Sequence, residues 1–273
     1  MPTIDERLKH VALKVKRAKE HIADVDAQLR AFYSTEPYKV GATIQPETRR
    51  PVYYVTRAHP TPESVPLVAG DAIQNLMSAL DYLAYQIICS DTADNPPNPN
   101  WIYFPIADDA MKYESKKAGK MRGAAKDSFD VIDGLKPYRG GNSLLWMLYK
   151  LNNVEKHRLL LTVGSQAAGV HIGQMVSPYL AGVFPAEAIA LIQNMDTFIV
   201  PADKGFPLKE GLELYIGAVG EKPNPKQQFR FQVALNERGI AEGEPLLETL
   251  HQLTTLVEGI VAALTPRLRD TTP

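Results

Sequence analysis

The residues best suited to chemistry form two polar clusters within otherwise apolar helical segments. The first cluster spans residues 70–82 and contains the side chains of Asp71, Asn75 and Asp81. Burying carboxylates and amides is costly unless they are paired or hydrogen-bonded, so their presence among apolar residues needs an explanation. We interpret these three side chains as one wall of a binding site, where they orient a ligand and accept hydrogen bonds from it.

The second cluster spans residues 151–158 and is followed at once by the apolar residues 159–161. His157 is its candidate catalytic residue, because histidine is the side chain that ordinarily exchanges protons near neutral pH. The candidate binding residues of this cluster are polar or charged: Asn153, Glu155, Lys156 and Arg158.

Helical geometry places seven polar residues on one stripe, about 120° wide, along the helix that carries the first cluster. We call this the polar stripe, and its members are Asp71, Gln74, Asn75, Ser78, Asp81, Tyr82 and Tyr85. Residues 64–90 contain no Lys, Arg or Glu, the residues that usually cover an exposed helix face. A half-buried stripe is therefore predicted, with an exposed stripe as the alternative.

If the two clusters meet, His157 or Arg158 reaches Asp71 or Asp81 across a charged pocket between their helices. The alternative for the second cluster is purely structural. Glu155 and Arg158 then form an i,i+3 pair, while the neighbouring cations lie near the helix C-terminus, where positive charge is favoured.

Composition excludes several classes of protein. The chain has 273 residues, and its 45% hydrophobic content is sufficient for a core. The 30 basic and 31 acidic residues give a formal net charge of -1, so no overall charge attracts nucleic acid or an anionic membrane. The strongest local positive run lies within residues 112–126. Cys89 is the single cysteine, which rules out an intrachain disulfide and a Cys-rich zinc site.

No metal, cofactor or membrane association is predicted. Glu248 and His251 have Glu-x-x-His spacing but lack further ligands, and no Gly-rich phosphate loop or nucleophile elbow is present. The most apolar stretch, residues 67–88, contains Asp71 and Asp81 and is unsuited to a bilayer. The polar first thirty residues indicate no secretory signal, and a cytoplasmic protein is expected.

A heptad seam about four repeats long occupies the first 33 residues, and Thr3 with Glu6 has the pattern of a capping box. The seam consists of Ile4, Leu8, Val11, Val15, Ala18, Ile22, Val25, Leu29 and Phe32. Either another helix of the chain or a second copy of the protein can bury it. We predict intramolecular packing over most of the seam, with homo-oligomer formation at its free end left open.

The remaining periodicity predicts a hairpin over 38–58, a helix over 64–90 and a short extended segment over 101–106. Two short helices are predicted within 108–138, separated near Gly123, and a helix capped by Asn142 runs to Arg158. Strands are predicted at 159–163, 170–176, 198–201, 212–219 and 228–235, followed by a helix over 245–264.

This order of elements predicts an α+β fold, in which a helical bundle with a long N-terminal helix packs with a mostly antiparallel sheet from the C-terminal half. We expect one domain. Residues 1–158 are then mainly helical, and residues 159–273 are β-rich and end in a helix.

The two clusters resemble the motifs of a bacterial protein family without an established activity. Its motifs are Gly-Asp…Asn-Leu-Arg-Ser-Ala-Leu-Asp-His and Leu-Asn…Asp-Lys-His-Arg. The Arg-x4-His of that family is in turn similar to the signature of HEPN domains, helical bundles that often cut RNA without a metal. This chain has Met77 and Tyr82 at the two positions. The resemblance therefore implies a catalytically weakened or repurposed relative.

Two functions follow as expectations. In the first, the polar pocket binds a small anionic ligand or an RNA phosphate, as in a degenerate HEPN-like RNase relative. In the second, the protein is a non-enzymatic interaction or assembly protein that associates through its N-terminal helix, and the clusters are structural networks that fix helix register.

Overall fold

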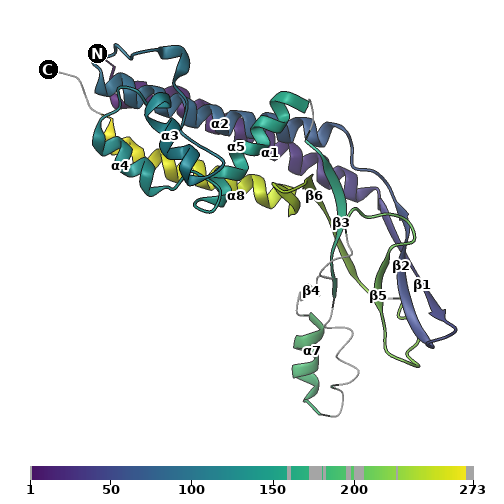
Figure 1. Cartoon of the computed structure of the whole chain (residues 1–273). Helices are drawn as coiled ribbons and strands as arrows, with labels where there is room; N and C mark the ends of the chain where they lie inside the picture. Colours follow the sequence, from purple (N-terminus) through teal and green to yellow (C-terminus); the bar gives the residue numbers. More distant parts are fainter. Residues whose placement is uncertain are drawn as a thin grey trace.

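The structure is a computed structural model that describes residues 2–158, 161–171, 180, 183–194, 198–199, 206–225 and 227–268. At 156–158, 170–171, 192–194 and 198–199 it describes the backbone alone. The fold is α+β, as predicted. Figure 1 shows an elongated molecule in which helices lie side by side in a bundle and the strands extend from one end as an arm.

The helices of the bundle are α1 (Ile4–Ser34), α2 (Ser64–Asp91), α3 (Ala110–Lys120), α4 (Lys126–Gly134), α5 (Ser143–Arg158) and α8 (Leu246–Leu264). Short 3-10 turns follow α2 and α8, namely η1 (Pro99–Trp101) and η2 (Thr265–Arg267). Helix α7 (Ala186–Asn194) lies in the arm (Figure 1).

The predicted heptad seam is the buried face of α1. Seven of its members, from Val11 to Phe32, are at most 8% exposed, while Ile4 and Leu8 are half-buried against the same core. Thr3 and Glu6 form the predicted capping box, with Thr3 N donating to Glu6 Oε2 at 2.8 Å. Helix α1 packs along α2 and also contacts α8, so the chain itself buries the seam.

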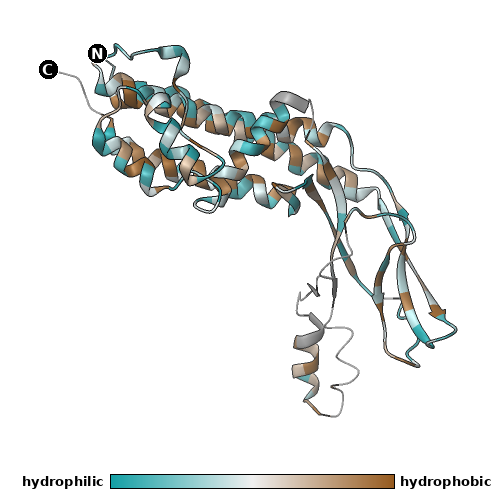
Figure 2. Cartoon of the chain, viewed as in Figure 1, coloured by the Kyte–Doolittle hydropathy of each residue, from teal (hydrophilic) through white to brown (hydrophobic). Residues whose placement is uncertain are grey.

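Helix α2 lies at the centre of the bundle and packs against α1, α5 and α8. Its apolar face is fully buried, with Ile73, Leu76, Leu80 and Leu83 each at 0% exposure. Apolar and polar stripes alternate around the bundle helices in Figure 2, as expected when each helix turns one side to a shared core. Because α8 comes from the C-terminal end, both halves of the sequence build the bundle.

Two antiparallel sheets form the arm. The first has the order β1-β2-β5, from β1 (Tyr38–Gln45), β2 (Arg50–Ala58) and β5 (Glu213–Ile216). The second has the order β4-β3-β6-β7, from β3 (Val163–His171), β4 (Phe198–Ile199), β6 (Phe229–Glu237) and β7 (Ala241–Pro245). The predicted hairpin is therefore β1–β2, but its sheet is completed by a strand from the C-terminal half.

Several local predictions were wrong or incomplete. Where they are described, the strands predicted at 159–163 and 170–176 are joined in one strand, since β3 runs from Val163 to His171 and its pairing with β6 continues through a bulge between Ala167 and Gly169. Residues 159–160 and 172–176 lie outside the described part of the chain. Of the extended segment predicted over 101–106, Trp101 belongs to η1 and Ile102 is extended; the segment joins no sheet, because the Phe104 N–H donates to Asp81. Helix α7 and strand β7 had not been predicted.

Candidate functional site

The two polar clusters meet where α2 crosses α5. A Cβ added to Gly70 would lie 2.8 Å from Cγ of the half-buried Glu155. The absence of a side chain at Gly70 is thus what lets the two helices approach at this point. The contact is close packing between the surfaces of the two helices.

Asp71 and Asn75 lie on the α2 surface one turn apart. Asp71 is exposed, and its backbone carbonyl accepts a hydrogen bond from Asn75 Nδ2 at 2.8 Å. Asn75 Oδ1 accepts another, at 3.2 Å, from Lys14 of α1. Asn75 therefore faces α1, and a lysine outside both clusters supplies the positive charge beside it.

Asp81 is half-buried and contacts a different neighbour, the segment after η1. Its Oδ1 accepts a hydrogen bond from the Phe104 N–H at 2.9 Å, which fixes the segment after η1 against α2. Ten residues of helix separate Asp71 from Asp81, about 15 Å along the axis. The two carboxylates therefore belong to different parts of the α2 surface.

The side chains of Lys156, His157 and Arg158 lie outside the described part of the chain. The predicted catalytic role of His157 and the predicted reach of Arg158 toward α2 therefore stay predictions. Asn153, also from the second cluster, is half-buried.

A cavity of about 470 Å³ borders the polar stripe on the side that faces α1 and residues 99–103. We call it the tyrosine cavity, after Tyr82 and Tyr85 of α2 and Tyr103 of the following segment. From α2 it is lined by four members of the polar stripe, Ser78, Asp81, Tyr82 and Tyr85, and by Gln86. The other lining residues are Arg7 and His10 of α1, and Pro99, Asn100, Ile102 and Tyr103 in and after η1.

A second hollow of about 370 Å³ continues along the groove between α1 and α2. We call it the basic hollow, because Lys14 and Arg17 line it together with Leu13 and Asn75. His10 and Tyr82 border both cavities, with ring centroids 6.5 Å apart. Lys14 Nζ lies 6.0 Å from the centroid of the Tyr82 ring. The tyrosine cavity and the basic hollow therefore adjoin at His10 and Tyr82, and together we call them the groove.

Arg7 is the site residue that sequence reasoning missed. Its side chain is 1% exposed, and it donates to both carboxylate oxygens of Asp94, at 2.8 and 3.0 Å. It also donates to Gln86 Oε1 at 3.4 Å. Ala93 and Asp94 have φ values of 50° and 60°. Arg7, which lines the tyrosine cavity, therefore holds this left-handed turn just after the end of α2. The sequence signal that could have identified Arg7 is a charged residue between two seam residues, Ile4 and Leu8.

Two titratable side chains at or near the tyrosine cavity, Tyr85 and Lys120, have shifted pKa values. The hydrogen bond with the buried thiol of Cys89 raises the pKa of Tyr85. Burial lowers the pKa of Lys120, and the nearby Asp81 carboxylate opposes that shift. Lys120 Nζ donates to Ile106 O at 3.1 Å, so this lysine, like Asp81, holds residues 102–107 against the bundle.

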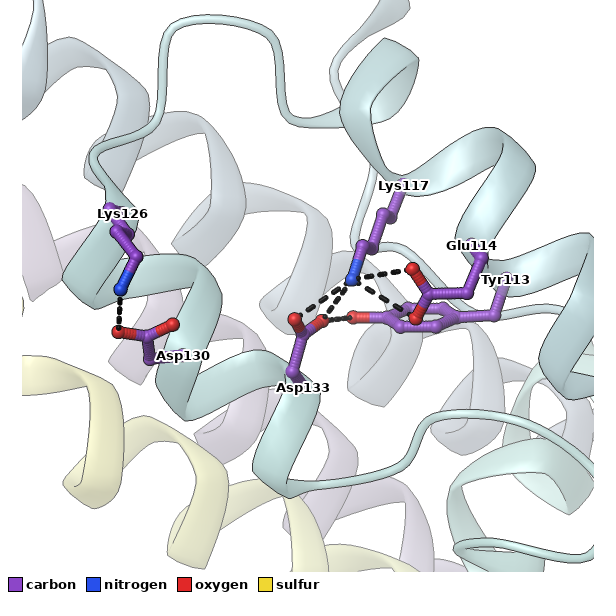
Figure 3. A network of polar contacts seen from close by, with 6 residues as sticks. All are labelled: Tyr113, Glu114, Lys117, Lys126, Asp130 and Asp133. Carbon is purple, nitrogen blue, oxygen red and sulfur yellow. Dashed lines mark hydrogen bonds and ion pairs between the residues drawn. The ribbon is translucent and has the colours of Figure 1, made fainter.

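Three cations of the positive run at residues 112–126 pair with carboxylates, namely Lys112 with Asp108, Lys117 with Asp133 and Lys126 with Asp130, and Figure 3 shows the last two pairs. Lys117 pairs with Asp133 at 2.8 Å and with Glu114 at 3.0 Å, while the Tyr113 hydroxyl donates to Asp133 at 2.6 Å. Burial, followed by the contact with Asp133, raises the pKa of Tyr113 well above its usual value. The contacts of Lys117 and Tyr113 with Asp133 tie α3 to α4.

Within the described residues, no group of His, Cys, Asp and Glu is arranged to hold a metal ion, and no helix is long and apolar enough to cross a membrane. Comparison with protein-family models, curated proteins and solved structures finds no match to this chain.

Proposed function

We propose that the protein binds a small anionic ligand in the groove formed by the tyrosine cavity and the basic hollow. The observation that carries this proposal is the position of Tyr82 and His10, which border both cavities and join an aromatic compartment to a cationic one. Cavities of about 300–1,000 Å³ are typical of sites for small molecules.

The groove offers the contacts that such a ligand requires. Lys14 and Arg17 attract a negative charge. Ser78 and Gln86 supply hydrogen-bonding groups beside the tyrosine rings. This proposal keeps the anionic ligand expected from the sequence and moves its site from the α2–α5 contact to the α1 side of α2.

The groove gives no support to RNA cleavage by a HEPN-type residue pair. Met77 is 5% exposed and belongs to the core, whereas Tyr82 is 44% exposed and lines the groove. The two positions equivalent to Arg-x4-His thus face different surroundings. We therefore propose binding rather than RNA hydrolysis.

Assembly through the N-terminal helix has less support. The α1 seam is buried against α2 and α8 within one chain, so most of it is unavailable to a second copy. Association at the exposed end of α1 stays a prediction.

A thermal-shift screen of small anionic compounds tests the proposal, because a ligand bound only by the folded state must stabilise it. A ligand at 100 times its Kd should raise Tm by about 5 °C. Tyr82→Ala and Lys14→Gln should each remove most of that shift. Lys16→Gln and Trp101→Ala are matched controls, because both side chains are exposed and neither lines the groove.

If every stabilising compound acts equally on the wild-type protein and the Tyr82 and Lys14 variants, the groove is not the binding site. If no compound raises Tm, the proposal is wrong.

A further inference from the structure

The two compartments of the groove differ in charge. In the tyrosine cavity, the Arg7 guanidinium is neutralised by Asp94, and Asp81 adds a carboxylate. In the basic hollow, Lys14 supplies positive charge, and Arg17 adds to it from an exposed pair with Glu20 at 3.1 Å, which water screens more than the buried Arg7 pair. An anionic group is therefore repelled from the first compartment and attracted to the second, which orients any ligand that fills both.

The tyrosine cavity favours a flat, unsaturated ring. Tyr82, Tyr85 and Tyr103 present aromatic surfaces in a space of about 470 Å³, and the His10 ring stands at its border with the basic hollow. Stacking on such rings is how proteins hold bases that are not in a duplex. Three tyrosines around one cavity point to a planar heterocycle rather than to an acyl chain.

The polar groups of the same cavity favour a heterocycle that carries an amino group. Gln86 and Asn100 bring amides, which pair with the edge of a base through one donor and one acceptor. The Asp81 carboxylate, whose Oδ1 accepts the Phe104 N–H, adds negative charge to the cavity, and this charge favours a ligand group that donates, such as an exocyclic amine, over a carbonyl oxygen. Ser78 adds a hydroxyl that can donate or accept.

The distance between the compartments suits one nucleotide. His10 and Lys14 are one helical turn apart on α1, about 6 Å along the axis, and Arg17 lies about 4.5 Å further along. A sugar between a base in the tyrosine cavity and a phosphate at Lys14 spans the separation of about 6 Å between His10 and Lys14.

We infer that the anionic ligand is a nucleoside monophosphate whose base carries an exocyclic amine, with the base among the tyrosines and the phosphate at Lys14 and Arg17. This inference rests on the proposed function and specifies its ligand. The same chemistry occurs in a free nucleotide and in one residue of a single-stranded RNA, and the test separates these sources.

Isothermal titration calorimetry of the full chain tests the inference with matched probes. AMP and CMP should bind at least tenfold more tightly than IMP and UMP, which have an oxo group in place of the amine. Adenosine and inorganic phosphate should each bind at least tenfold more weakly than AMP, because each fills one compartment. A hexa-adenylate that binds more tightly than AMP identifies RNA as the source, and one that binds equally or more weakly identifies the free nucleotide.

Variants locate the two ends of the ligand. Tyr82→Ala and Lys14→Gln should each weaken AMP binding about tenfold or more, the loss typical of one stacking contact or one charge-assisted contact. Tyr82→Phe keeps the ring and should retain AMP binding. Lys16→Gln and Trp101→Ala should leave it unchanged, and circular dichroism verifies that each variant is folded.

The results also separate this inference from the proposed function. If no nucleotide binds, but another anionic compound stabilises the protein in a manner that depends on Tyr82 and Lys14, the ligand class is wrong and the site is correct. If AMP binds equally well to the Tyr82→Ala and Lys14→Gln variants, the inferred placement is wrong. If no anionic compound depends on these residues, both the inference and the proposed function fail.

Discussion

Removal of Arg7 or Asp94 should cost unequal amounts of stability, because the two side chains are buried to different extents. The Arg7 side chain is 1% exposed and that of Asp94 is 34% exposed. Asp94→Ala leaves a buried guanidinium without its counter-ion, and breaking a buried pair in this way costs about 3–5 kcal/mol. Because Asp94 partly reaches water, we expect a loss of about 3 kcal/mol, near the lower limit.

Arg7→Met should lower the free energy of unfolding much less than Asp94→Ala does. Methionine has a similar length and places an apolar side chain beside the seam of α1, while the remaining carboxylate of Asp94 can turn to solvent. We expect a loss of about 1 kcal/mol, and about the same in the double variant, since Asp94→Ala strands no charge once Arg7 is absent. The coupling energy between the two positions is then about 3 kcal/mol.

Urea denaturation followed by circular dichroism at 222 nm measures these four free energies of unfolding. Arg30→Met is the control on the same helix, because the Arg30 side chain is 79% exposed in its pair with Asp26. It should change stability by no more than about 0.5 kcal/mol. If Arg7→Met costs more than Asp94→Ala, or if the double variant loses the sum of the two, the stranded charge is not the cause.

Three further predictions concern packing, titration and the N-terminal helix. Gly70→Ala should cost about 1–2 kcal/mol, because the added methyl meets Glu155 Cγ at 2.8 Å, and a Glu155→Ala background should abolish the loss in thermal denaturation. Burial raises the pKa of Asp133, but hydrogen bonds from Lys117 and Tyr113 outweigh it and hold the pKa below its ordinary value. The Asp133 carboxylate therefore stabilises the folded state above about pH 4, and this stabilisation is lost as pH falls through the lowered pKa. Urea midpoints should therefore fall less steeply below pH 4 in Asp133→Asn than in the wild type. Deletion of residues 1–33 should abolish cooperative unfolding, because the α1 seam covers α2 and α8; a truncated chain that stays folded but changes from dimer to monomer in sedimentation would contradict this packing.

The sequence predicted the elements whose signals are local. The seam of α1, its capping box at Thr3 and Glu6, and the Asn142 cap of α5 each depend on residues within a few positions of one another. The separation of α3 and α4 at Gly123 is also local, since this residue has a φ of 102°. Such features follow from backbone geometry and need no distant partner.

Elements that depend on distant partners could not be predicted in this way. Residues 101–106 have an extended pattern, but the Phe104 N–H is bound by Asp81, which is 23 positions away. Strand β7 is short and polar, and it forms beside β6 rather than from its own periodicity. Tertiary contacts decide these segments, and one sequence shows no trace of them.

The candidate site illustrates the same limit. The polar stripe was recognised because short polar residues replaced Lys, Arg and Glu, and that absence has a structural reason. Short side chains such as Ser78 and Asn75 line the two cavities, where longer side chains would fill the space between α2 and its neighbours. The positive charge then comes from the neighbouring helix, where Lys14 extends across to Asn75 Oδ1 at 3.2 Å. The two polar clusters alone pointed to α5 as the source of positive charge, although α1 also packs along α2 and supplies Lys14. A helix without long charged residues indicates a site whose charges are supplied by its neighbours.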